Sequence, residues 1–217
     1  MPYLEANTVI STALTDLLNA IVLLPLLLLM HRHLPKGRPE SRLWKMFMTM
    51  VALASFIGFV LHIHPWSRLL LICIWVPLYA TMFQGLHSLL LLAIHTARGS
   101  TGLRPGERSL LQWIEGFMLS MLIVFLLLDK NPIRLFLFFG VALIVPSFYF
   151  FFRLALRGHH GSRILLTAIL PLIAGLPLQI MRRSDVMLGN LDFNGIYHLC
   201  ILISILIFYA ASKKWES

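Results

Sequence analysis

Asn194 and His198 are polar side chains capable of chemistry in an otherwise apolar segment near the C-terminus. They are four residues apart, so on a helix they lie on one face. A polar pair inside hydrocarbon needs partners on neighbouring helices. Two other apolar segments offer such partners, because one contains Asp16 and another ends at His62. We therefore predict that Asp16, His62 and His198 lie together.

Two imidazoles and one carboxylate form a ligand set typical of catalytic zinc, which keeps a fourth position open for water. Zinc lowers the pKa of that water toward about 7 and so supplies hydroxide at neutral pH. A hydroxyl or amide beside the metal can hydrogen-bond an oxyanion. On the second apolar segment, Ser55, Gly58 and His62 share one stripe, and Gly58 would allow a close helix neighbour. The candidate site comprises the metal ligands Asp16, His62 and His198 and the catalytic side chains Ser55, Asn194 and Asp192.

A purely structural explanation competes with this one. Thr12, Asp16 and Asn19 recur at helical spacing, and such a polar stripe can serve only to hold helices together. The two His residues can likewise bond separately to backbone or hydroxyl groups. His64, beside a proline, is expected at the membrane interface.

The elements that must position these residues are membrane-spanning helices. The chain is 59% hydrophobic and 12% charged, whereas soluble domains carry about 25% charged residues. Seven apolar segments approach the roughly 20 residues that cross a bilayer as helix. We predict an all-α bundle of seven spans forming a single transmembrane domain over residues 1–217, with the spans at approximately 8–30, 43–62, 67–97, 109–128, 132–152, 162–181 and 191–212.

The basic residues indicate an orientation. Of the 18 Lys and Arg residues, 13 fall in the loops after spans one, three and five or in the C-terminal tail. The positive-inside rule therefore predicts an outside N-terminus and a cytoplasmic C-terminus. We expect the membrane to be a bacterial plasma membrane. The net charge of +9 is explained by these short loops, so no nucleic-acid partner is expected.

Seven spans with an outside N-terminus, a Ser and a His on span two and a polar pair on span seven resemble the membrane hydrolase superfamily that contains alkaline ceramidases, progestin/adiponectin receptors and Per1-like proteins. That family shows Ser-x-x-x-His on span two and His-x-x-x-His on span seven. The matching residues are Ser55 and His62, seven apart, and Asn194 and His198, with Asn194 standing where the family has His. The resemblance implies a zinc ion, an attacking water and hydrolysis of an amide or ester in a membrane lipid. Gly58-x-x-x-His62 together with residues 192–198 also resembles uncharacterised bacterial multi-pass proteins, which implies no activity.

A second polar group lies nearer the cytoplasmic side. Gln84, His87 and His95 belong to the third span, and Gln112 and Glu115 to the fourth, so a contact between His87 and Glu115 is expected. The two groups together could form stations of a proton or small-solute transporter. Few polar residues connect them, which favours the enzyme. A haem-binding electron carrier is a third hypothesis, because imidazoles on different spans can supply two axial ligands.

Overall fold

The computed structural model describes residues 10–99, 104–128, 132–181, 187–188 and 191–215 of the 217. Within these ranges the chain forms seven α-helices and one small hairpin. The helices are α1 (Ile10–His33), α2 (Pro39–Ile63), α3 (Arg68–Arg98), α4 (Pro105–Leu127), α5 (Pro132–Leu156), α6 (His160–Met181) and α7 (Phe193–Lys213), and the strands are β1 (Met187–Leu188) and β2 (Leu191–Asp192).

Each predicted span corresponds to one helix, with ends that differ by at most four residues. Several starts carry a proline in the first turn, where the missing N–H costs nothing, as at Pro39 and Pro105. Two of the turns place a glycine at positive φ, Gly37 at 88° and Gly158 at 90°. Other residues rarely adopt that conformation.

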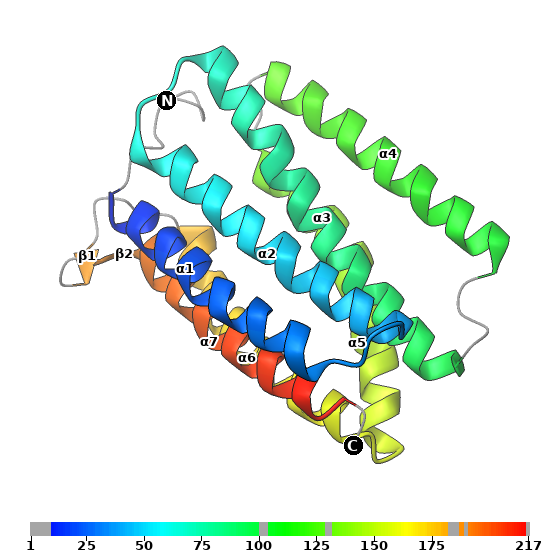
Figure 1. The fold of residues 1–217 in the computed structure, drawn as a ribbon. Coiled ribbons are helices and arrows are strands. Elements are labelled where there is room, and N and C mark those ends of the chain that lie inside the picture. Colours follow the sequence, from blue (N-terminus) through cyan, green and yellow to red (C-terminus); the bar gives the residue numbers. More distant parts are fainter. Residues whose placement is uncertain (1–9, 100–103, 129–131, 182–186, 189–190, 216–217) are drawn as a thin grey trace.

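Successive helices run in opposite directions (Figure 1). Helices α1, α3, α5 and α7 therefore all end at one end of the bundle, which we call the basic end. The described cations at this end are Arg32, Lys36, Arg38, Arg42, Lys45, Arg98, Arg104, Arg108, Arg153, Arg157, Arg163, Lys213 and Lys214. The opposite end carries the starts of α1, α3 and α7.

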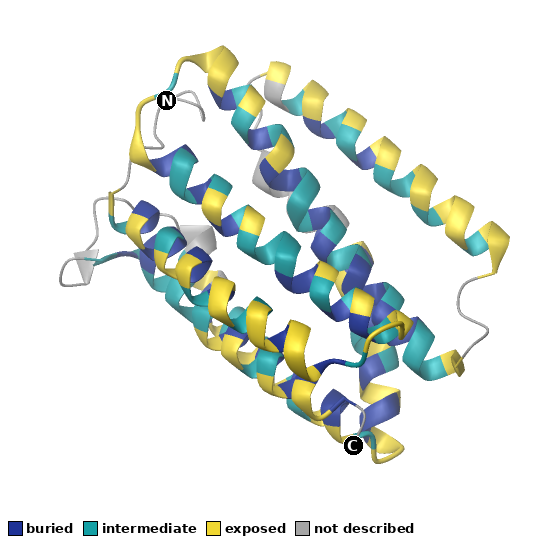
Figure 2. Cartoon of the chain, viewed as in Figure 1, coloured by how far each residue is buried: buried dark blue, intermediate teal, exposed yellow. Residues whose placement is uncertain are grey.

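The outer surface of the bundle is apolar. Large side chains such as Leu28 and Trp113 are exposed, Trp113 by 77%, and exposed residues follow the outward faces of the helices (Figure 2). Five of the described helices are long and apolar enough to cross a membrane: α1, α2, α3, α4 and α7. A soluble protein would not expose so much apolar surface, so this chain is a multi-pass membrane protein.

The packing of α1 positions the site. Helix α1 lies between α2 and α7, and α7 packs in turn against α6. A core of large side chains fills the basic half of these contacts, including Trp44, Phe151 and Phe208. The opposite half of the α1 interface is polar, with Thr12, Asp16 and Asn19 all buried.

Candidate functional site

Asp16 on α1 and His198 on α7 are in direct contact. The carboxylate oxygen Oδ1 lies 2.6 Å from Nδ1 of the imidazole. Asp16 is 2% exposed as a residue, whereas the His198 side chain keeps 16% of its surface exposed. An ionised carboxylate only accepts hydrogen bonds, so Nδ1 donates to it, and in the neutral ring Nε2 then carries the lone pair. The pair thus holds a potential base in a fixed orientation.

The carboxylate of Asp16 also lies against the backbone of α2. A Cβ atom placed on Gly58 would stand 2.7 Å from Oδ2 and 3.0 Å from Cγ of Asp16. Gly58 therefore provides the close approach expected from the sequence, although the group it admits is the carboxylate. Oδ2 is buried and has no hydrogen-bond partner among the described residues. A buried acceptor of this kind is costly unless a donor reaches it.

The stripe predicted on α2 faces the protein interior. Ser55 is 7% exposed and His62 is 6% exposed, and Gly58 between them is buried as well. His64 lies beyond the helix, exposed, with its ring packed at 4.9 Å and 71° against Trp66. The α2 residues thus share the helix face that meets Asp16, and His64 lies apart from them.

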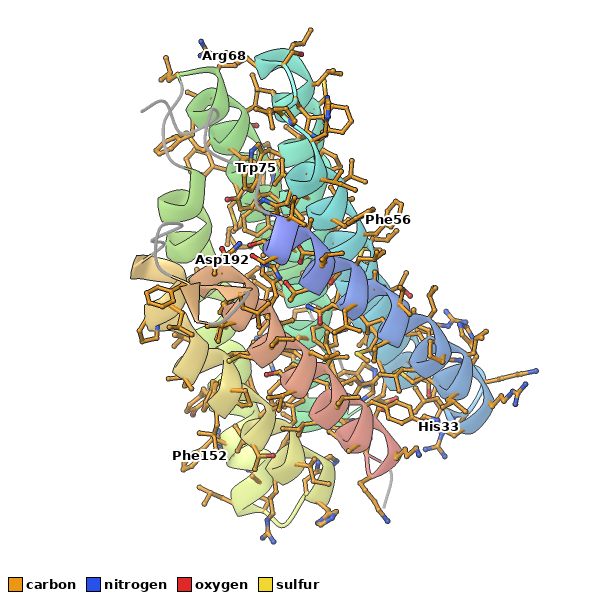
Figure 3. All side chains as sticks on the ribbon, turned by 90° about the vertical axis from the view of Figure 1, so that its left-hand side faces the viewer. His33, Phe56, Arg68, Trp75, Phe152 and Asp192 are labelled. Carbon is orange, nitrogen blue, oxygen red and sulfur yellow. The ribbon has the colours of Figure 1, made fainter. Side chains whose placement is uncertain are left out.

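Asp192 anchors the start of α7. It is the N-cap residue, and its Oδ1 accepts from the backbone N–H of Gly195 at 3.0 Å. Ser11 and Thr12 of α1 donate their hydroxyls to the same carboxylate, at 2.5 Å and 3.1–3.2 Å. Asp192 lies beside the first turns of α1 (Figure 3). Because the carboxylate of Asp192 accepts from groups on both helices, it joins α1 to α7.

Two asparagines extend this junction. Asn194 donates through Nδ2 to the Thr12 hydroxyl at 3.2 Å, and Asn19 donates through Nδ2 to the backbone carbonyl of His198 at 3.1 Å. Asn19 therefore fixes the α7 backbone at the residue that carries the imidazole. Oδ1 of Asn194 is buried without a partner among the described residues and so can still accept a hydrogen bond.

The structure supplies a pair of potential ligands, but no metal-binding group of three. Within the described ranges, no three His, Cys, Asp or Glu side chains lie close enough together to hold a metal ion. Asp16 and His198 bond directly to each other, and His62 completes no ligand group with them. As placed, these side chains do not fit the three-ligand zinc site predicted from the sequence. The zinc site stays a prediction, and we derive no chemical step through it.

A second carboxylate–imidazole contact lies between α3 and α4. Nδ1 of His87 contacts Oε1 of Glu115, as the sequence predicted, and Gln84 donates to Oε2 of the same carboxylate at 3.4 Å. Gln112 is exposed and lies outside this group. His95 pairs with Glu40 of α2 at 3.0 Å near the basic end.

Sequence reasoning missed several residues of the site. Ser11 and Gly195 both bond Asp192, and Glu40 partners His95. One local signal in the sequence pointed to the contacts around Asp192. An Asp placed directly before a long apolar segment is a strong N-cap candidate, and Asp192 occupies that position. No comparable local signal identifies Ser11, because its contact depends on which helix packs beside α7.

Fold and site together define a multi-pass helical membrane protein with an Asp–His pair between its first and last helices. The chain belongs to the family DUF6962, a family of unknown function, whose model matches residues 11–217. The match covers every helix that carries the site except the first residue of α1. No curated protein matches the chain, and no solved structure does.

Proposed function

We propose that this protein is a membrane-embedded hydrolase that cleaves an ester or amide bond of a membrane lipid, with the Asp16–His198 pair as its base. The proposal includes seven spans in a bacterial plasma membrane, with the N-terminus outside, which places the pair in the outer half of the membrane. Alternating helix directions and the concentration of cations at the basic end support that topology.

The 2.6 Å contact between Asp16 and His198 carries the proposal. In this mechanism Asp16 holds the Nδ1 proton, so that Nε2 accepts a proton from water as the water oxygen attacks the lipid carbonyl. The imidazolium then returns the proton to the departing alcohol or amine. The buried carboxylate stabilises the positive charge that the ring acquires between these two steps.

The remaining candidates surround this pair. Asn194 and Ser55 are assigned as hydrogen-bonding groups for the oxyanion that forms on the lipid carbonyl. Asp192 acts as a positioning residue, because it fixes the start of α7 against α1. Zinc bound by Asp16, His62 and His198 stays a separate prediction from the sequence, and metal analysis of the purified protein tests it. Stoichiometric zinc that is lost in His62→Ala and His198→Ala would establish the metal, and its absence from folded protein would exclude it.

Lipid turnover by purified protein tests the hydrolase. The protein in lipid nanodiscs is incubated with defined ester-linked and amide-linked lipids, and released fatty acid is quantified by mass spectrometry. We expect His198→Gln and Asp16→Asn each to lower the rate by about 10²-fold or more, the usual contribution of a positioned base. His64→Gln is the matched control, since that imidazole lies at the same end of the bundle but apart from the pair, and it should retain the wild-type rate.

Two results would overturn this proposal. One is the absence of fatty acid release by folded wild type across both lipid classes. The other is a rate of lipid cleavage that is the same in His198→Gln and Asp16→Asn as in the wild type.

The contact between His87 and Glu115 favours a second candidate, a proton-coupled transporter. Two carboxylate–imidazole pairs at different depths could pass a proton across the membrane. Proteoliposomes with an internal pH dye test this, because proton flux should depend on both pairs and fall in Glu115→Gln as well as Asp16→Asn. An enzyme would tolerate Glu115→Gln without loss of lipid turnover.

A further inference from the structure

At the basic end, a hollow of about 350 Å³ lies between α3 and α5. It is lined by Ala97, Arg98, Tyr149, Phe150, Arg153, Leu154 and Arg157. Helices α3 and α5 pack against each other and end at the same end of the bundle (Figure 1). The hollow is far from the Asp16–His198 pair, which lies near the starts of α1 and α7.

Three guanidinium groups line this hollow, and all three arginines are exposed. Tyr149, Arg153 and Arg157 are four residues apart, so they follow one face of α5 and its last turn. Aromatic rings hold two of the cations in place. Arg153 donates to the Tyr149 hydroxyl at 3.3 Å with its Cζ 5.7 Å from the ring centroid, and Cζ of Arg98 lies 6.0 Å from the Phe150 ring.

No residue lining the hollow is acidic. The carboxylate nearest in the described contacts is Glu107, which pairs with Nη1 of Arg98 at 2.8 Å and also accepts from the backbone N–H of Arg104. One carboxylate against three guanidinium groups leaves a positive site. Between the cations the lining is apolar, with Leu154 7% exposed and Ala97 and Phe150 partly buried. The site is therefore amphipathic, with an apolar floor and a cationic rim.

We propose that this hollow, the Arg98–Arg153–Arg157 site, binds the phosphate headgroup of an anionic membrane phospholipid. Guanidinium forks match phosphate oxygens in bidentate geometry. An apolar floor between two helices suits the start of an acyl chain, which a soluble anion lacks. Tyr149, which lines the hollow, and Phe152, three residues further along α5, are exposed aromatic residues, a type that is enriched at membrane interfaces.

In the topology proposed above, the basic end is cytoplasmic, so this lipid would belong to the cytoplasmic leaflet. Basic pockets between helices on that side are a recurring form of anionic lipid site. The simpler explanation is that these arginines only mark topology and offset the negative ends of the α3 and α5 dipoles. If that explanation holds, removing the arginines of the hollow should affect lipid binding no more than removing other cations at the same end. Matched variants therefore distinguish the two explanations.

The test measures lipid retention by detergent-solubilised protein. Phosphatidylglycerol or phosphatidylcholine is titrated in, and bound lipid is counted by native mass spectrometry. We expect one phosphatidylglycerol to bind more tightly than phosphatidylcholine. Arg153→Gln/Arg157→Gln should weaken phosphatidylglycerol binding about 25-fold, taking about fivefold for each basic residue. The control Arg32→Gln/Lys36→Gln removes the same charge from exposed positions at the same end and should weaken it less than twofold.

Three results would overturn this proposal. Equal weakening in the two double variants would reduce the effect to diffuse charge. Equal binding of phosphatidylcholine would remove the preference for an anion. Displacement of the lipid by millimolar glycerol phosphate or inorganic phosphate would assign the site to a soluble anion. Arg153→Lys/Arg157→Lys guards against misfolding, because it keeps the charge and should bind more tightly than the Gln pair. These outcomes do not depend on whether the Asp16–His198 pair hydrolyses lipid.

Discussion

At the scale of single residues, the contact of Gly58 with Asp16 leaves little space. A methyl group on Gly58 would lie 2.7 Å from Oδ2, so α1 and α2 would have to separate or the carboxylate would have to turn. We expect Gly58→Ala to lower the free energy of unfolding by about 1–3 kcal/mol, as other overpacking substitutions do. A turned carboxylate would also lose its hydrogen bond with Nδ1 of His198. The rate of lipid hydrolysis should therefore fall as well. Thermal unfolding in detergent and the turnover assay measure the two effects.

Gly116 on α4 provides the matched control. It is an exposed helical glycine with no heavy atom within 4 Å of an added Cβ. Gly116→Ala should therefore stabilise the protein by about 0.4–1 kcal/mol, because alanine restricts the unfolded chain and favours helix. Equal stability of Gly58→Ala and Gly116→Ala would contradict the close approach of Asp16 to α2.

The same scale shows what could be predicted for the site. The depths of Asp16 and His198 in their apolar segments were enough to predict that they meet, because both lie about two turns from the same end. Spacing also identified Gly58 as a close-contact position. The sequence did not predict that Asp192 joins α7 to α1 through Ser11, because that depends on the rotation of one helix about its axis relative to another.

At the scale of elements, the start of α7 depends on one side chain. Asp192 accepts from Gly195, Ser11 and Thr12, so it both caps α7 and bonds it to α1. We expect Asp192→Ala to cost about 2 kcal/mol of unfolding free energy, the upper range for losing an N-cap. Asp192→Asn should cost less, because asparagine also caps helices well. Thermal unfolding of the two variants checks this order, and equal losses would show that capping is not the main contribution.

Helix positions were predictable because hydrophobic length determines them. The seven apolar segments and the seven described helices agree to within four residues. The differences have a physical cause, since α2 and α4 begin four residues earlier than predicted, at Pro39 and Pro105, in sequence that is charged but still helix-forming. Apolar length marks the part of a helix inside hydrocarbon, whereas the helix itself continues into the polar interface.

At the scale of the whole molecule, the sequence did not predict which helices pack against each other when they are distant in the chain. The contact between α3 and α5 creates the Arg98–Arg153–Arg157 site, yet nothing local to either helix specifies its neighbour. The sequence therefore explained these arginines only as a topology signal. The positions of the helices follow from the sequence, while the order of helices around the bundle depends on complementary side-chain shapes.

The C-terminal tail ties several helices together at the basic end. Trp215 is 4% exposed and packs its ring against Trp44 of α2 at 5.1 Å and Phe151 of α5 at 5.8 Å. Its indole N–H donates to the Thr96 hydroxyl of α3 at 3.2 Å. Gly161 lets α6 approach this ring, because a Cβ there would lie 2.8 Å from Cε3. One side chain thus contacts α2, α3, α5 and α6.

His159 makes this junction sensitive to pH. Its ring packs 4.8 Å from the Trp215 ring, and its Nδ1 accepts from the backbone N–H of Ser162 at 3.1 Å, which caps the start of α6. Burial lowers the pKa of His159 below its ordinary value of 6.5; a backbone hydrogen bond to Trp215 partly opposes this lowering, and the neighbouring His160 adds a smaller lowering. The folded protein therefore favours the neutral ring, which alone can accept from Ser162.

The sign of the pH effect follows from that lowered pKa. Stabilisation by His159 is fully present above about pH 6.5, where the ring is neutral in both the folded and unfolded chain. It is lost as the pH falls below 6.5 and through the folded value, because the unfolded chain binds the proton first. Thermal unfolding between pH 8 and pH 5 should therefore show a decline that is shallower in His159→Asn, which keeps a capping side chain without a titrating ring. Every other His residue is present in both proteins, so the difference between the two curves reports His159 together with its charge interaction with the neighbouring His160. Parallel curves would mean that burial does not hold the His159 ring neutral.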